Sequence, residues 1–270
     1  MKILWLGLAI VPAALLAQNP PVKIYPVPRG PDGKPDLTGI YQPASNRRGT
    51  WEEANSDGLA GNPFGATPGA RTAPARGAAR EPAPYQDWAS KKVLESFNRR
   101  AIDDPTAFCL KPGVPRVTSV GLFPMQIVQT PKTIVMLYEY MNSQRVIPIN
   151  ARHPDDLEPS FMGDSVGRWD GDTLVVDVTS FNDKTWLIGA GTFHTESLHV
   201  TERYNMADRD MINYEATMED PKVLTKPWVY RTTIMRREGT RLREYECEEN
   251  NQDPARYEKL LKDESVFRRQ

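Results

Sequence analysis

Residues 166–180 read VGRWDGDTLVVDVTS, with strand-forming residues on both sides of Asp170-Gly171. An Asp-Gly pair accommodates the positive backbone φ angles that a tight two-residue hairpin turn requires. After the turn, Leu174, Val176 and Val178 share one face of a strand, and the other face carries Thr173, Val175, Asp177 and Thr179. This stretch therefore predicts an antiparallel β-hairpin.

Similar alternating stretches precede and follow this hairpin, separated by turn residues. Together with the two strands of the hairpin, the predicted strands span residues 126–130, 133–141, 144–149, 166–169, 172–180, 195–205, 211–219, 227–236 and 241–248. No helix-length pattern interrupts them, which argues against a parallel sheet with crossover helices. The predicted fold is mainly β: a single antiparallel β-barrel-like meander of the kind found in lipocalins and other calycins, with a sandwich as the alternative.

The N-terminal region predicts export. Residues 1–17 begin with Met1-Lys2 and continue as an uncharged apolar run, which is typical of a signal peptide. The run is shorter than the roughly 20 residues that a membrane span needs. We therefore expect a mature bacterial protein that is periplasmic or secreted and has no membrane span.

The rest of the chain divides by composition. Residues 18–85 are rich in Pro, Gly and Ala and predict a flexible arm, within which residues 35–41 can dock as a short edge strand. An amphipathic helix is expected at residues 86–101. The barrel-like domain is expected to span residues 86–260, with a polar tail at residues 261–270.

Composition limits the chemistry. The formal net charge of -1 gives no electrostatic reason to expect nucleic acid or an anionic membrane as a partner. Zinc ribbons, iron–sulfur clusters and nucleotide-binding glycine motifs have no matching pattern, so no cofactor is predicted. Cys109 and Cys247 are the only cysteines. Export permits a disulfide between them, and the alternative is two separately buried thiols.

Residues 163–167, Gly-Asp-Ser-Val-Gly, match the G-x-S-x-G motif of α/β-hydrolases. That motif needs a strand before the serine and a helix after it. Here a loop precedes Ser165 and a hairpin follows it. We therefore do not expect Ser165 to be a hydrolase nucleophile.

Residues 194–204, HTESLHVTERY, are the most unusual predicted strand. Alternation places His194, Glu196, Leu198, Val200, Glu202 and Tyr204 on one face, and the burial preference of Leu198 and Val200 predicts that this face points inward. His194 and Glu196 would then form an acid–base or polar ligand-binding pair. The alternatives are a polar rim with cross-strand ion pairs, such as Glu202 with an arginine, and, least favoured, a metal site.

Further candidates lie on neighbouring segments. Asp177 sits in mid-strand, where aspartate is disfavoured, and it joins His194 and Glu196 as a candidate catalytic residue. Loops at a barrel mouth commonly meet ligands. The candidate ligand-binding residues are Glu202, Tyr204, Trp169, Asn182, Lys184 and Trp186. The aromatic residues have a simpler interpretation as core, and residues 181–186 as a turn held by Asn and Asp side chains.

Several motifs together resemble an uncharacterised family of exported bacterial proteins. The matching segments are residues 35–39, 109–116, 129–132, 162–169, 171–177, 181–186, 194–204 and 226–228. They cover most of residues 105–250. The resemblance implies that Ser165 belongs to a shared hairpin motif, and it implies no substrate or catalytic residue.

Three functions follow from these patterns. The leading hypothesis is the binding of a small molecule in the barrel cavity or at its mouth, because polar groups and aromatic residues are expected to face inward. The first alternative is an isomerase, lyase or hydrolase that uses His194 with Glu196 or Asp177 as acid and base. The second is a structural or protein-interaction domain of the cell envelope.

Overall fold

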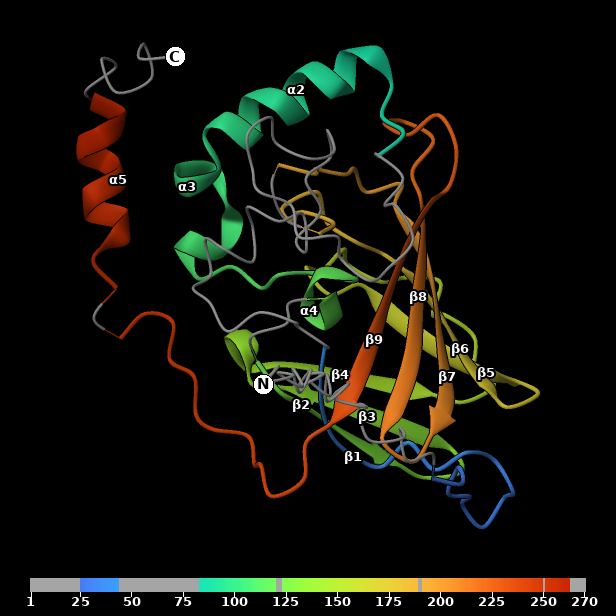
Figure 1. Cartoon of the computed structure of the whole chain (residues 1–270). Coiled ribbons are helices and arrows are strands. Elements are labelled where there is room, and N and C mark those ends of the chain that lie inside the picture. Colours follow the sequence, from blue (N-terminus) through green and yellow to red (C-terminus); the bar gives the residue numbers. More distant parts are fainter. Residues whose placement is uncertain (1–24, 44–82, 120–122, 189–190, 250, 263–270) are drawn as a thin grey trace, which may run out of the picture.

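The computed structural model describes residues 25–43, 83–119, 123–188, 191–249 and 251–262. Over these residues the protein is a nearly closed antiparallel β-barrel with a few short helices (Figure 1). The predicted fold class is confirmed. The predicted signal peptide and most of the predicted arm lie outside the described residues.

Nine strands form the sheet within the described part of the chain. They are β1 (Gly39–Pro43), β2 (Met125–Gln129), β3 (Thr133–Tyr138), β4 (Ser143–Pro148), β5 (Asp164–Asp170), β6 (Thr173–Thr179), β7 (His199–Asp208), β8 (Met211–Glu219) and β9 (Trp228–Arg236). Each is antiparallel to its hydrogen-bonded neighbours, in the order β4-β3-β2-β1-β9-β8-β7-β6-β5. Chain neighbours are therefore sheet neighbours everywhere except between β4 and β5, and β1 joins β9.

Strand β1 comes from the segment that the sequence assigned to a flexible arm. It lies in the middle of the sheet and pairs with β2 through Gly39–Ile127 and with β9 through Tyr41–Arg236. Tyr41 is fully buried, and burial of its ring helps to offset the entropy of ordering the segment. The prediction of an edge strand at residues 35–41 was therefore wrong: the strand spans Gly39–Pro43 and is central in the sheet.

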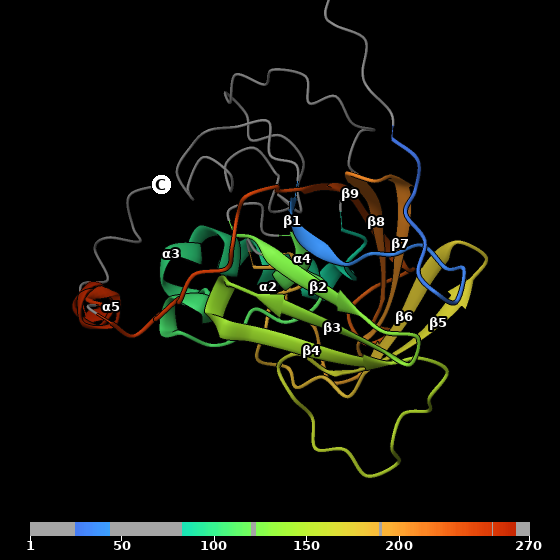
Figure 2. The ribbon, with the colours of Figure 1, turned by 90° about the horizontal axis from the view of Figure 1, so that it is seen from below.

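The barrel closes at a seam between β4 and β5. An odd number of alternating strands leaves these two terminal strands parallel, and parallel neighbours need a long connection. The loop of residues 149–163 supplies it and extends away from β4 in Figure 2. A parallel bridge from Ile149 to Gly167 joins the two strands, and the Asn150 amide donates to the Gly167 carbonyl at 2.7 Å.

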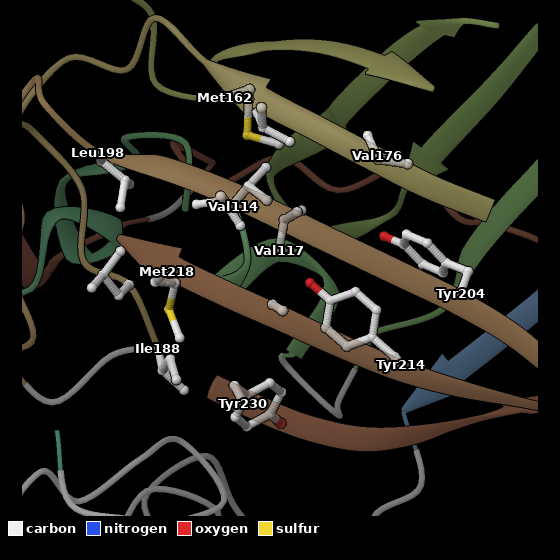
Figure 3. Close-up of a cluster of buried hydrophobic side chains, with 14 of the residues drawn as sticks. Val114, Val117, Met162, Val176, Ile188, Leu198, Tyr204, Tyr214, Met218 and Tyr230 are labelled. Carbon is white, nitrogen blue, oxygen red and sulfur yellow. The ribbon is translucent and has the colours of Figure 1, made fainter. Parts of the chain in front are cut away.

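A short segment fills one part of the barrel. We name residues 112–119 the plug; all of them are buried, and they include the helix α4 (Arg116–Ser119). Val114 and Val117 lie among strand side chains such as Val176, Tyr204 and Tyr214 (Figure 3). The plug therefore belongs to the hydrophobic core.

Helices and a disulfide hold the outer parts of the chain. The helices are α2 (Asp87–Asn98), α3 (Arg100–Asp103), η1 (Pro105–Phe108), η2 (Tyr140–Asn142) and α5 (Asp253–Lys262). The disulfide joins Cys109 to Cys247, with 5.5 Å between their Cα atoms, and confirms the predicted pair. None of the described helices is long and apolar enough to span a membrane.

The segment of residues 241–248 was predicted to be a strand and is not one. It runs outside the sheet, where Tyr245 packs edge-on against Phe123 and Tyr140. Its alternation survives, because Tyr245 and Cys247 are half-buried while the intervening glutamates are exposed. Alternating burial against a small aromatic cluster thus produced a strand-like pattern without strand pairing.

Gly167 allows β4 and β5 to meet. A Cβ atom at this position would lie 2.8 Å from Ile149 Cδ1 and 3.0 Å from Ile147 Cγ2. We expect Gly167→Val to lower the free energy of unfolding by about 1–3 kcal/mol, because it overpacks the seam. In urea denaturation, adding Ile149→Ala should make the double variant more stable than the summed single effects predict. An unchanged stability of Gly167→Val would contradict this description of the seam.

Candidate functional site

The barrel interior contains a buried ion pair. Arg145 on β4 donates from Nη2 to Glu202 Oε2 on β7 at 2.5 Å, and the two side chains are 2% and 0% exposed. Arg145 Nη2 and Nε also donate to Ser165 Oγ on β5, at 2.9 and 3.3 Å. One guanidinium therefore links the two seam strands to a strand farther round the barrel.

Two tyrosines complete the surroundings of Glu202. Tyr204 and Tyr214 donate their hydroxyl protons to Glu202 Oε1 at 2.9 and 2.8 Å. Burial, together with the nearby Glu202 charge, raises the pKa of both phenols well above the ordinary value. They stay protonated, and they remain donors to the carboxylate.

The pair depends on mutual compensation. Burial alone would lower the pKa of Arg145, but the Glu202 carboxylate outweighs it and raises that pKa above the ordinary value. A buried ion pair is costly to assemble, and it is often no more stable than apolar residues of similar volume. Removing one partner alone leaves an uncompensated buried charge and costs about 3–5 kcal/mol. If the pair only stabilised the barrel, apolar residues of similar volume would do so equally well.

One part of Arg145 is not satisfied. Its Nη1 atom is buried and has no hydrogen-bond acceptor among the described residues. An unmet buried donor costs about 1–3 kcal/mol. Tyr138 is the nearby phenol on β3: burial raises its pKa, while the charge of Arg145 and side-chain contacts with Thr118 and Arg145 act in the opposite direction. Within the part of the chain that the structure describes, no acceptor meets the Nη1 group with hydrogen-bond geometry.

The plug covers this polar cluster. Thr118 Oγ1 lies 3.1 Å from Tyr138 Oη, within hydrogen-bonding distance. Val117 packs in the same core as Tyr204 and Tyr214 (Figure 3). A molecule that reaches Arg145 from the plug side must therefore take the place of plug side chains.

His194 and Glu196 do not form the predicted inward pair. His194 is buried, with Nε2 2.6 Å from Thr185 Oγ1 and Nδ1 3.0 Å from the Thr195 carbonyl. Burial lowers its pKa, so the neutral ring satisfies both contacts. Glu196 is exposed, because residues 195–198 form a turn and β7 begins only at His199. The prediction of an inward Glu196 was wrong.

Asp177 lies in a different setting, on the outer face of the sheet. His153 Nε2 is 2.9 Å from Asp177 Oδ2, and His199 Nε2 is 2.7 Å from Asp177 Oδ1. His153 also contacts Asp164 Oδ2 at 2.6 Å, and His199 Nδ1 lies 3.3 Å from Glu219 Oε2. We name these five residues the outer row. The predicted convergence of Asp177 with His194 and Glu196 is not observed.

The outer row pairs imidazoles with half-exposed carboxylates, which is a general acid–base arrangement. It stands on the solvent side of the strands, because Val176 and Val178 point inward on either side of Asp177. A reacting group would remain in water there and lose the benefit of a closed site. Among the described residues, no group of His, Cys, Asp and Glu is arranged to hold a metal ion. The interior cluster is therefore the stronger candidate site.

The remaining predicted site residues lie in different parts of the structure. Glu202 and Tyr204 are in the interior cluster, while Trp169 is partly buried and packs against the core. Asn182 Oδ1 accepts from the Lys184 amide at 3.1 Å in a turn, with the Lys184 side chain exposed. Trp186 is buried against Arg116, 5.9 Å from its guanidinium. The turn interpretation of residues 181–186 agrees with these contacts.

Sequence reasoning missed Arg145, and it did not place His153 beside Asp177. Arg145 alternates with Val146 in a run that otherwise reads as an ordinary strand, and the buried positions of β4 are Ser143, Arg145 and Ile147. The alternation itself was the available signal, because it places Arg145 on the same face as Ile147. His153 lies in the irregular loop after β4, where spacing gives no direction for a side chain.

Comparisons with known proteins add little to this geometry. No family model matches the sequence. No curated protein matches it. A crystal structure of a mutant of the fluorescent protein UnaG is similar, with 15% identity, a TM-score of 0.28, and coverage of 54% of this chain and 89% of that chain. Membership in the family of exported bacterial proteins therefore stays a prediction.

Asp177 provides a test of the outer row. Partial burial would raise its pKa, but hydrogen bonds from His199 and His153 outweigh burial and lower the pKa below 3.8. A lowered folded-state pKa contributes stability above about pH 4, and that contribution is lost as the pH falls through the folded value. Replacing both histidines by alanine should therefore raise the Asp177 pKa.

Carboxyl NMR titration measures this change directly. Asp172, whose pKa is lowered by a hydrogen bond from Arg29, is an internal control that should not move. An Asp177 pKa that is the same with and without the two histidines would contradict the described contacts.

Proposed function

We propose that the protein binds a small molecule inside the barrel, at the Arg145–Glu202 cluster. The observation that carries the proposal is the buried Nη1 donor of Arg145, which lacks an acceptor among the described residues. Native proteins rarely leave such a donor unmet. An oxygen of a bound molecule would satisfy it.

The plug is the part of the interior that can give way. Its residues pack inside the barrel but do not belong to the sheet, and backbone bonds such as Val117 to Gly113 and Thr118 to Pro115 are local. Moving the plug therefore breaks no pairing between strands. A molecule that replaced Val114 and Val117 would occupy an apolar space lined by Tyr204, Tyr214 and Met218.

Anchors within the plug and just before it would keep it close when it moves. Arg116 makes two hydrogen bonds to Asp104, at 2.8 and 2.6 Å. Burial would raise the pKa of Asp104, but the charge and hydrogen bonds of Arg116, together with hydrogen bonds from Thr106, lower it below the ordinary value. The Cys109–Cys247 disulfide fixes the chain just before the plug. We propose that the plug swings on these anchors.

The disulfide also supports a location outside the cytoplasm. Structural disulfides persist in oxidising compartments and are rare in the cytosol. We propose that the protein is exported and that it meets its ligand in the periplasm or outside the cell.

Binding of Nile red, a neutral dye whose emission shifts to the blue in apolar surroundings, tests the proposal. Gly113 has a φ of +77°, and a Cβ atom there would lie 2.6 Å from Thr185 Oγ1. Gly113→Ala should therefore loosen the plug and bind Nile red about three- to tenfold more tightly than the unmodified chain, because more molecules are open. Fluorescence titration of the full chain gives both dissociation constants.

Gly33→Ala is the matched control. Gly33 also has a positive φ, of +75°, but a Cβ atom there meets nothing within 4 Å, so the affinity should not change. Hydrogen exchange should also show faster exchange of the plug amides when the dye is bound. Absence of saturable binding in both the unmodified chain and Gly113→Ala would overturn the proposed function.

A further inference from the structure

The charges inside the barrel are already balanced. Arg145 and Glu202 are both fully buried, and their closest atoms are in contact. Among the described residues, the other buried arginine is Arg116 in the plug, which is paired with Asp104. The interior cluster therefore has no surplus positive charge to offer to an anion.

The hydrogen-bonding capacity of the cluster is also almost fully used. Glu202 accepts from Arg145, Tyr204 and Tyr214. The hydroxyl of Tyr138 is engaged with Thr118 and with the sulfur of Met136. The Nη1 group of Arg145 is what remains as a donor among these residues. A ligand would be recognised through one acceptor oxygen.

We infer that the barrel selects neutral lipophilic molecules with a carbonyl oxygen, such as amides, ketones and esters, and that Glu202 excludes carboxylates. This inference rests on the proposed function. A neutral carbonyl satisfies the Nη1 donor and adds no charge. A carboxylate at the same place would bring a net negative charge into a buried site beside Glu202, and an uncompensated buried ion is strongly disfavoured.

Glu202 is thus the residue that sets specificity. With glutamine at this position, Arg145 would have no counter-ion, and its charge would be available to a ligand. The same substitution keeps the shape of the side chain and an acceptor oxygen. It should therefore convert a site for neutral molecules into one that also accepts anions.

Competition against Nile red with decanamide and decanoate at pH 7.5 measures this selectivity, because the two probes differ mainly in charge. In the unmodified full chain, decanamide should compete at least about tenfold more strongly than decanoate. In Glu202→Gln, the difference should shrink to less than about threefold or reverse. Glu215→Gln is the matched control: Glu215 pairs with Arg231 on the adjacent strands at a solvent-exposed position, so the tenfold preference should remain.

The unmodified chain alone decides the inference even where Glu202→Gln does not fold. Decanoate that competes as strongly as decanamide would overturn the selectivity and leave the proposed function standing. A preserved tenfold preference in folded Glu202→Gln would remove Glu202 as its cause. Failure of Nile red and both probes to bind would overturn the proposed function and this inference together.

Discussion

The ion pair between Arg145 and Glu202 is the constraint on which the structure depends. It lies inside the barrel and, with Ser165, joins β4, β5 and β7. Neither charge can be buried alone without a cost of several kcal/mol. The barrel must therefore close far enough to bring strands that are distant in the sheet together around one guanidinium.

This constraint also affects how strands β4 and β5 are joined at the seam. Strands β4 and β5 are the ends of the sheet, and the bridge from Ile149 to Gly167 is the backbone pairing between them. Arg145 adds a side-chain link across the same gap through Ser165. An open sheet edge favours unwanted pairing with other chains. The buried pair thus contributes both to barrel closure and to the polar centre of the candidate site.

Much of the fold could be predicted from the sequence, because alternation and turn residues are local signals. The Asp170-Gly171 hairpin, the inward positions of Glu202 and Tyr204, and the partner cysteines were all readable. The residues at which strands begin and end could not be predicted in the same way. The turn at residues 195–198 interrupts the strand before β7 and leaves Glu196 exposed, while His194 and Leu198 on either side stay buried.

The site was less predictable, because its parts come from distant segments. An arginine partner for Glu202 was one expected alternative, but which arginine depends on how β4 meets β5 and β7. The contact of Asp177 with His153 likewise requires the long loop to return over the outer face. Two prolines and a glycine in residues 112–115 indicate a loop, but they do not show that this segment enters the barrel.

A double-mutant cycle on Arg145→Met and Glu202→Gln, measured by urea denaturation, tests the central claim most directly. Each single variant should lose about 3–5 kcal/mol, because each leaves one buried charge without its partner. The double variant should lose less than the sum by at least about 2 kcal/mol, because both charges are gone. Small, additive losses would show that the pair does not hold the barrel together and would contradict this account.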